Sequence, residues 1–208
     1  VRLVGSEMCI RDSSSENRFL GAFLFSLGLF CIVQFKYGLF TGKVGYIVNR
    51  DLPYVAETAV TLVGNALGTL IAALLLRQVR FFTSTVSTMD VTISDRVQAT
   101  VDGKIHDNPL SIFILAIFCG ILMFTAVEGS RKCKEEKNFA GSLFVVVMPV
   151  MVFIICGFNH CIADMFYYFF AGCPEPSKAI VYFILAIAGN SVGGMIVPLL
   201  KKLSNQPL

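Results

Sequence analysis

Charged residues are scarce in this sequence. Only 15% of its 208 residues are Asp, Glu, Lys or Arg, whereas 55% are hydrophobic, and the mean hydropathy is +0.73. A soluble domain rarely exposes so little charge, so the composition indicates an integral membrane protein. The Lys and Arg residues flank apolar stretches, which suits membrane topology rather than nucleic-acid binding.

Metal-binding and disulfide patterns are also missing. The seven cysteines form no Cys-x-x-Cys pair and show no Cys/His spacing typical of a metal site. Four of them, Cys31, Cys119, Cys156 and Cys161, fall inside apolar stretches and are interpreted as small apolar core residues. We therefore expect no cofactor, no metal site and no disulfide framework.

Histidine is nearly absent, which bears on haem. The chain has two histidines. Haem bound through histidines needs paired axial ligands at one depth of the membrane. His106 lies in a polar connection and His160 lies inside an apolar run. A haem-binding membrane subunit of a redox enzyme is therefore a disfavoured alternative.

The first residues lack both an initiating Met and the charged, apolar and small-residue order of a signal peptide. Residues 1–13 read VRLVGSEMCIRDS and resemble translated sequencing-adaptor read-through. We interpret 1–13 as a non-native tail and 14–208 as one transmembrane domain.

Apolar runs predict five membrane spans, at about residues 19–48, 54–76, 109–127, 139–171 and 179–200. The first is broken by a polar, glycine-rich stretch near residues 36–43. The fourth is broken at residues 157–165, where an apolar run holds a glycine, an amide, an imidazole and a carboxylate. Polar groups at that depth are costly, so they mark a functional-site hypothesis. Residues 81–108 are interpreted as an extramembrane connection.

A short motif occurs twice. Gly64-Asn65-x-x-Gly68 matches Gly189-Asn190-x-x-Gly193, and each copy follows a broken span. The second unit consists of a plain span, a broken span and the motif span, whereas the first shows only the last two. Units of three spans are odd and therefore inverted in the membrane, as in many transporters. The repeat predicts an all-α membrane protein whose first helix is missing.

Basic residues set the predicted orientation. The connection after the third span holds Arg131, Lys132, Lys134 and Lys137, and the C-terminal end holds Lys201 and Lys202. Two spans separate these groups, so they share a side, and the positive-inside rule makes that side the cytoplasm. The C-terminus is predicted to be cytoplasmic.

The segment Leu39-Phe40-Thr41, both GN-x-x-G motifs and the run GFNHCIADMF resemble the formate/nitrite transporter family over about residues 19–200. The family pattern at the second break reads GF-x-H-S-I-A-N-M, and this chain departs from it at Cys161 and Asp164. The resemblance implies an aquaporin-like, six-span protomer in a homopentamer, with one pore per protomer. It also implies a carrier of small monovalent anions in the bacterial inner membrane, and not an enzyme.

The resemblance also implies roles for individual residues. The central pore site is His160 with Thr41. Apolar constrictions are formed by Phe25, Leu29, Phe40 and Phe153. Lys104 belongs to the vestibule, and supporting positions are Asn159, Asp164, Asn65 and Asn190.

The chemistry of these side chains suits a weak-acid anion. Thr41 offers a hydroxyl donor, and His160 donates from one nitrogen when neutral and from both when charged. With an ordinary pKa of about 6.5, histidine can also give the anion a proton. Apolar constrictions would then exclude water and hydrated ions, while Lys104 would concentrate anions.

Simpler interpretations stay open. His160 can serve only as a helix-packing hydrogen bond, and Phe25 can be an ordinary apolar residue. Lys104 can be a solvated charge, and Lys36 can either extend to the interface or add positive potential. Asp164 can orient the ring of His160 or cap a backbone N–H of the resumed helix, and the cap is favoured.

The predicted function is therefore a channel or transporter for formate or nitrite, with protons as a second partner and no nucleic acid. Hydrosulfide and the short-chain carboxylates lactate and acetate are alternatives, because all are small and monovalent. A neutral-solute pore of aquaporin type is a further alternative that the vestibule lysine and the titratable histidine disfavour.

Overall fold

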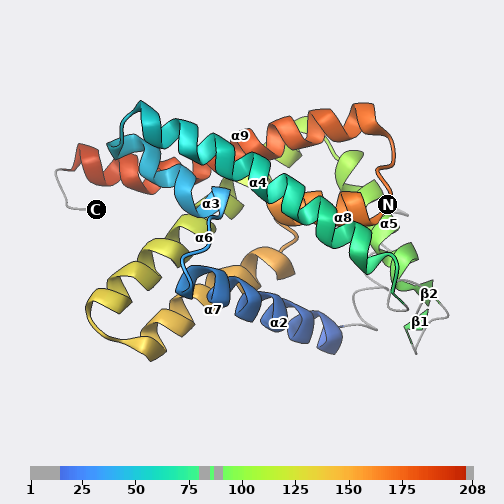
Figure 1. Cartoon of the computed structure of the whole chain (residues 1–208), viewed down its shortest axis with the longest axis horizontal. Coiled ribbons are helices and arrows are strands. Elements are labelled where there is room, and N and C mark those ends of the chain that lie inside the picture. Colours follow the sequence, from blue (N-terminus) through green and yellow to red (C-terminus); the bar gives the residue numbers. More distant parts are fainter. Residues whose placement is uncertain (1–14, 80–84, 87–90, 205–208) are drawn as a thin grey trace. The chain divides into compact units, whose positions relative to one another are not determined.

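The computed structural model describes residues 15–79, 85–86 and 91–204, so the proposed tail at residues 1–13 lies outside the described part (Figure 1). Its elements are α2 (Ser15–Gln34), α3 (Phe40–Lys43), the 3₁₀ helix η1 (Val44–Asn49), α4 (Leu52–Leu76), β1 (Thr85–Val86), β2 (Val91–Thr92), α5 (Ile93–Ile105), α6 (Pro109–Glu135), α7 (Phe139–Ile155), α8 (Cys161–Phe170) and α9 (Pro176–Leu203).

The chain forms two compact units. The first comprises residues up to Tyr37 together with Thr125–Gly157, and the second comprises Gly38–Phe124 and Phe158–Leu208. Helix α6 therefore contributes its N-terminal part to the second unit and its C-terminal part to the first.

In the first unit, α2 packs beside α7 (Figure 1). The rings of Phe25 and Phe153 meet edge to face, with centroids 6.1 Å apart. Toward the other end of this pair, Gln34 Nε2 donates to Ser142 Oγ at 2.9 Å. The ammonium of Lys134 donates to the carbonyl of Val33 in the last turn of α2, where a cation stabilises the helix.

In the second unit, α4 lies along α8, and α9 packs against η1 (Figure 1). Helix α5 contacts both α8 and α9. Helices α6 and α9 approach closely, because a Cβ on Gly193 would lie 2.0 Å from the carbonyl oxygen of Ile117. Only glycine fits at that position.

The two copies of the repeated motif have different surroundings. A Cβ on Gly189 would lie 2.5 Å from the Cβ of Ala116 on α6. At Gly64 and Gly68 on α4, by contrast, such a Cβ would have no described atom within 4 Å apart from the neighbouring residues and backbone of its own helix. The motif on α9 is packed against a helix, whereas the motif on α4 is open in the described part of the chain.

Both helix breaks are present. The first runs from Phe35 to Leu39, between α2 and α3, and the second separates α7 from α8. Helix α7 ends at Ile155, and Cys156 is its C-cap residue. Gly157 follows with a φ of 71°, the left-handed conformation that glycine adopts readily at a helix C-terminus. The chain resumes as α8 directly after His160.

Three described helices, α4, α6 and α9, are long and apolar enough to cross a membrane, whereas the helices flanking the breaks are shorter. The prediction of an all-α membrane protein is confirmed. The connection at residues 81–108, expected to lie outside the membrane, contains an antiparallel pair of two-residue strands and the 13-residue helix α5. The helix of the third predicted span continues beyond residue 127 to Glu135.

Candidate pore site

Thr41 and His160 meet at the two helix breaks. Thr41 is the second residue of α3, and His160 is the residue that caps the N-terminus of α8. Thr41 Oγ1 lies 3.0 Å from His160 Nε2, and the two residues are 0% and 4% exposed. Both belong to the second unit. The fold therefore brings together the two residues that the sequence predicts as the central site.

The second ring nitrogen of His160 is also engaged. The backbone N–H of Ala163 donates to His160 Nδ1 at 3.1 Å, which caps the first turn of α8. Because Nδ1 accepts this bond, the proton of the neutral ring lies on Nε2 and is donated to Thr41 Oγ1. The hydroxyl oxygen of Thr41 is then the acceptor in this contact.

Asn65 on α4 holds the first break. The backbone N–H of Phe40 donates to Asn65 Oδ1 at 2.9 Å, and Asn65 Nδ2 donates to the carbonyl of Gly38 at 2.9 Å. The amide thus connects two backbone groups on either side of Leu39 and fixes the start of α3.

Asn190 on α9 holds the second break in the same way. The backbone N–H of Cys161 donates to Asn190 Oδ1 at 2.9 Å, and Asn190 Nδ2 donates to the carbonyl of Asn159 at 2.8 Å. Asn190 Nδ2 also donates to the carbonyl of Ala116 on α6 at 2.8 Å. These bonds fix the backbone on both sides of His160.

Lys104 lies beside the second break. Its ammonium donates to Asn159 Oδ1 at 2.8 Å and lies 3.1 Å from Asp164 Oδ1. The other carboxylate oxygen of Asp164 accepts the hydroxyl of Tyr182 on α9 at 2.6 Å. Asn159 also donates to the carbonyl of Ile112 on α6. Lys104 is thus bound to the residue that precedes His160.

Two expectations change here. Lys104 is in the last turn of α5 rather than in a loop, and its side chain is only 20% exposed, so it is not a freely solvated charge. The favoured role of Asp164 as a cap is wrong, because His160 makes the cap of α8. Asp164 forms an ion pair with Lys104 instead.

A sequence model described as formate/nitrite transporter matches residues 3–202. The chain belongs to the formate/nitrite transporter family. The formate channel FocA of Haemophilus influenzae is 28% identical over 151 residues, which cover 72% of this chain and 52% of that protein. The chain therefore spans about half the length of this relative of the formate/nitrite transporter family.

Two solved structures share the fold. One, described as a pentameric formate channel with formate bound, aligns with a TM-score of 0.67 and 23% identity, covering 90% of this chain and 83% of that one. The other, described as an FNT family ion channel, aligns with a TM-score of 0.76 and 15% identity, covering 93% and 79%. This formate/nitrite transporter family member is thus a multi-pass membrane protein.

The residues expected to form constrictions fall into two groups. Phe25, Leu29 and Phe153 are in the first unit, where Phe25 is 37% exposed, while Leu29 and Phe153 are buried. Phe40 is buried in the second unit, directly before Thr41. The structure brings Phe25 into contact with Phe153 and leaves Phe40 with the central site of this formate/nitrite transporter family member.

Tyr182 was not expected from the sequence. It is 2% exposed, and its hydroxyl binds Asp164. A signal was available, because Tyr182, Ala186, Asn190 and Gly193 follow helical spacing and all are buried. A tyrosine on the same face of α9 as the GN-x-x-G motif indicates that this face makes a second polar contact besides that of Asn190.

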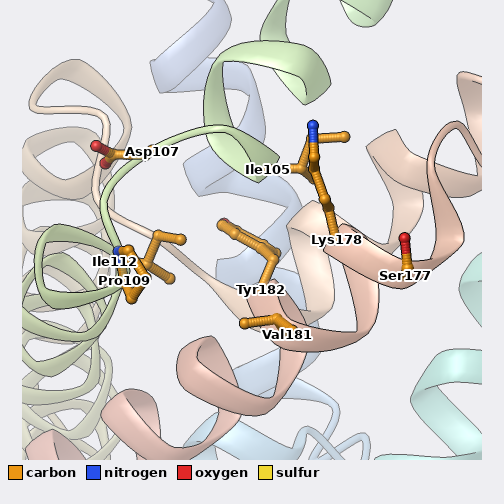
Figure 2. A pocket seen from close by; sticks show the side chains of 8 residues that line it. All are labelled: Ile105, Asp107, Pro109, Ile112, Ser177, Lys178, Val181 and Tyr182. Atoms are coloured by element: carbon orange, nitrogen blue, oxygen red, sulfur yellow. The ribbon is translucent and has the colours of Figure 1, made fainter.

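A cavity of about 310 Å³ lies where α5, α6 and α9 meet. Its lining residues are Ile105, Asp107, Pro109, Ile112, Ser177, Lys178, Val181 and Tyr182. Figure 2 shows Tyr182 between the α6 residues and Lys178. Tyr182 therefore connects this cavity with the Lys104–Asp164 pair.

His106, the other histidine of this formate/nitrite transporter family member, is in an exposed charged cluster. Its Nε2 lies 2.7 Å from Lys178 Nζ and 3.1 Å from Glu175 Oε1. The hydrogen bond from Lys178 holds the pKa of Glu175 below its usual range. Among the described residues, no group of three or more His, Cys, Asp and Glu side chains could hold a metal ion.

Proposed function

We propose that the chain forms a transmembrane channel for small monovalent weak-acid anions, with formate or nitrite as substrate, and that it is not an enzyme. The observation that carries this proposal is the buried contact of 3.0 Å between Thr41 Oγ1 and His160 Nε2. It places a hydroxyl and an imidazole together between two interrupted helices of a transporter-family fold.

The physical need for these groups is clear. Transfer of a bare anion into an apolar medium costs on the order of 20 kcal/mol in the idealised case, and still several kcal/mol after relaxation. Hydrogen-bond donors at the centre of the path lower this barrier. Thr41 supplies its O–H, and a small movement of His160 would free Nε2–H for the anion.

Proton transfer to the anion has a structural requirement. The neutral ring of His160 takes up a proton only at Nδ1, which now accepts the N–H of Ala163. A charged His160 would therefore release its cap on α8 and donate from both nitrogens. In our proposal this charged ring gives its Nε2 proton to the anion, which leaves as the neutral acid past the apolar residues Phe25, Leu29, Phe40 and Phe153.

The assembly follows the same proposal. A structural neighbour that shares the fold is described as a pentameric channel with formate bound. We propose a homopentamer in the bacterial inner membrane, with the C-terminus in the cytoplasm and protons as the second partner. Hydrosulfide, lactate and acetate are the alternative substrates of this site.

The test is formate flux into liposomes that carry the purified protein, measured from pH 5 to pH 8. Wild-type flux should exceed that of empty liposomes and rise as the pH falls, while glycerol flux stays at the background. At saturating formate, His160→Ala should abolish the pH dependence of the flux. The matched control is His106→Ala, which removes the only other histidine and should leave the dependence intact.

Each part of the proposal has its own opposing result. Unchanged pH dependence in His160→Ala would exclude the proton-transfer role of that ring. Glycerol flux equal to formate flux would indicate a neutral-solute pore instead of an anion channel.

A further inference from the structure

A buried carboxylate lies one helical turn after His160. Asp164 is 5% exposed, and both of its oxygens have partners. Oδ1 is 3.1 Å from the ammonium of Lys104, and Oδ2 accepts the hydroxyl of Tyr182 at 2.6 Å. An ionised carboxylate is buried at acceptable cost only when it is paired and hydrogen-bonded in this way.

Position 164 is one of the two positions at which this chain departs from the family pattern that it resembles, which has asparagine there. Here, Asp164 neutralises Lys104. The central site is coupled to this pair, because Lys104 also binds the side chain of Asn159, the residue before His160.

The other groups around Asp164 do not supply a second charge. The thiols of Cys119 on α6 and Cys161 on α8 and the phenol of Tyr167 are within its electrostatic reach. Helix α4, which also packs on α8, has no titratable side chain between Glu57 and Arg77. With His160 neutral, Lys104 and Asp164 therefore form a cluster with no net charge.

We propose that Asp164 is a specificity-determining residue that makes an anion bind beside Lys104 together with a proton rather than alone. This inference rests on the proposed channel function. An anion that approached the neutral ion pair alone would leave the buried cluster with a net negative charge. If Asp164 takes a proton from solution, its carboxylate becomes neutral, and the ammonium of Lys104 is released to pair with the anion.

The proton is conserved in this exchange. One O–H bond forms on Asp164 as the anion arrives, and the same proton leaves when the anion leaves and the ion pair re-forms. Asp164 suits this role because an ionised carboxylate has about four acceptor positions, of which the structure occupies two. His160 acts at a later step, at the central site, where a proton on Nδ1 releases the cap of α8.

The test is Asp164→Asn, which installs the residue of the family pattern. Formate uptake is measured in liposomes at equal inner and outer pH, and the half-saturating formate concentration is determined at pH 5.5 and pH 7.5. We expect the wild-type value to rise with pH. In Asp164→Asn it should be about tenfold lower at pH 7.5, which corresponds to about 1.4 kcal/mol. It should also be nearly independent of pH.

Two controls isolate the pair. Asp102→Asn removes a carboxylate from the same helix as Lys104, two residues away, and should behave as the wild type. Lys104→Gln combined with Asp164→Asn should lose the tighter binding, because the gain depends on the released ammonium.

The outcomes separate this inference from the channel function. If the wild type moves formate, and Asp164→Asn has the same half-saturating concentration and the same pH dependence as the wild type, the inference is wrong and the channel function stands. Wild-type liposomes that move no formate above empty ones overturn the channel function and the inference with it. If Asp164→Asn does not assemble, Tyr182→Phe decides. Loss of the hydroxyl donor should shift the pH dependence to higher pH, and an unchanged profile contradicts the role of Asp164.

Discussion

His160 combines a structural role with a chemical one, and two substitutions can separate them. Its Nδ1 caps α8, and its Nε2 is bonded to the buried hydroxyl of Thr41. His160→Ala removes both contacts. His160→Asn keeps a side chain that caps helices well but is too short to replace the imidazole at Thr41.

The free energies of unfolding of the two variants should differ by the contribution of the helix cap. Loss of a cap costs about 0.5–2 kcal/mol. The buried hydroxyl of Thr41, left without its partner, adds about 1–3 kcal/mol in both variants. His160→Ala should therefore be less stable than His160→Asn by about 1 kcal/mol. For a chain of this size that difference lowers the Tm by roughly 2–4 °C.

The assay is thermal unfolding in detergent, followed by the helical circular dichroism signal because the chain has no tryptophan. Flux at saturating formate is measured on the same preparations and should lose its pH dependence in both variants. Equal Tm values for the two variants would show that the cap made by His160 does not stabilise α8. Wild-type pH dependence in His160→Asn would refute the ring as the proton-transfer group.

Two further results are expected. Gly193→Ala should lower the Tm by several degrees or prevent assembly, because its Cβ would lie 2.0 Å from the carbonyl oxygen of Ile117. Gly68→Ala, at the matching position of the repeat, should leave the Tm of this chain nearly unchanged. Equal effects of the two substitutions would contradict the close packing of α6 on α9. The hydrogen bonds from the Thr92 side chain and backbone lower the pKa of Asp95. This capping-box contribution to stability is therefore present above the ordinary pKa of an aspartic acid and is lost as the pH falls through the lowered value. Asp95→Asn should weaken the acid-induced increase in hydrogen exchange of α5, and an unaltered increase would show that the cap is not its cause.

The sequence predicted the parts of the fold that depend on local composition. Both breaks were visible because glycine and polar side chains interrupt apolar runs, and the pairing of Thr41 with His160 followed from the resemblance and the matched breaks. Helix α5 was missed although its signals were present. Thr92 and Asp95 have the spacing of a capping box, and Val97, Val101 and Ile105 form the buried stripe of an amphipathic helix. The polar composition of residues 81–108 indicated only an extramembrane connection.

The partner of Asp164 could not be predicted in the same way. Lys104 is far away in the sequence, on a helix that was not expected, and Tyr182 is on a third helix. Only the packing of α5 and α9 on α8 brings the three side chains together. Local reasoning about residues 157–165 therefore favoured a cap, which the neighbouring histidine already makes.

The two asparagine clamps also show how the two helix breaks differ. Asn65 joins the carbonyl of Gly38 to the N–H of Phe40, and Asn190 joins the carbonyl of Asn159 to the N–H of Cys161. Aligned by these bonds, the counterpart of His160 is Leu39, and the counterpart of Thr41 is Ile162. The same backbone clamp thus occurs twice in the chain, but the polar side chain lies at a different step in each copy. The hydroxyl and the imidazole therefore meet although the two clamps are not related by equivalent residues.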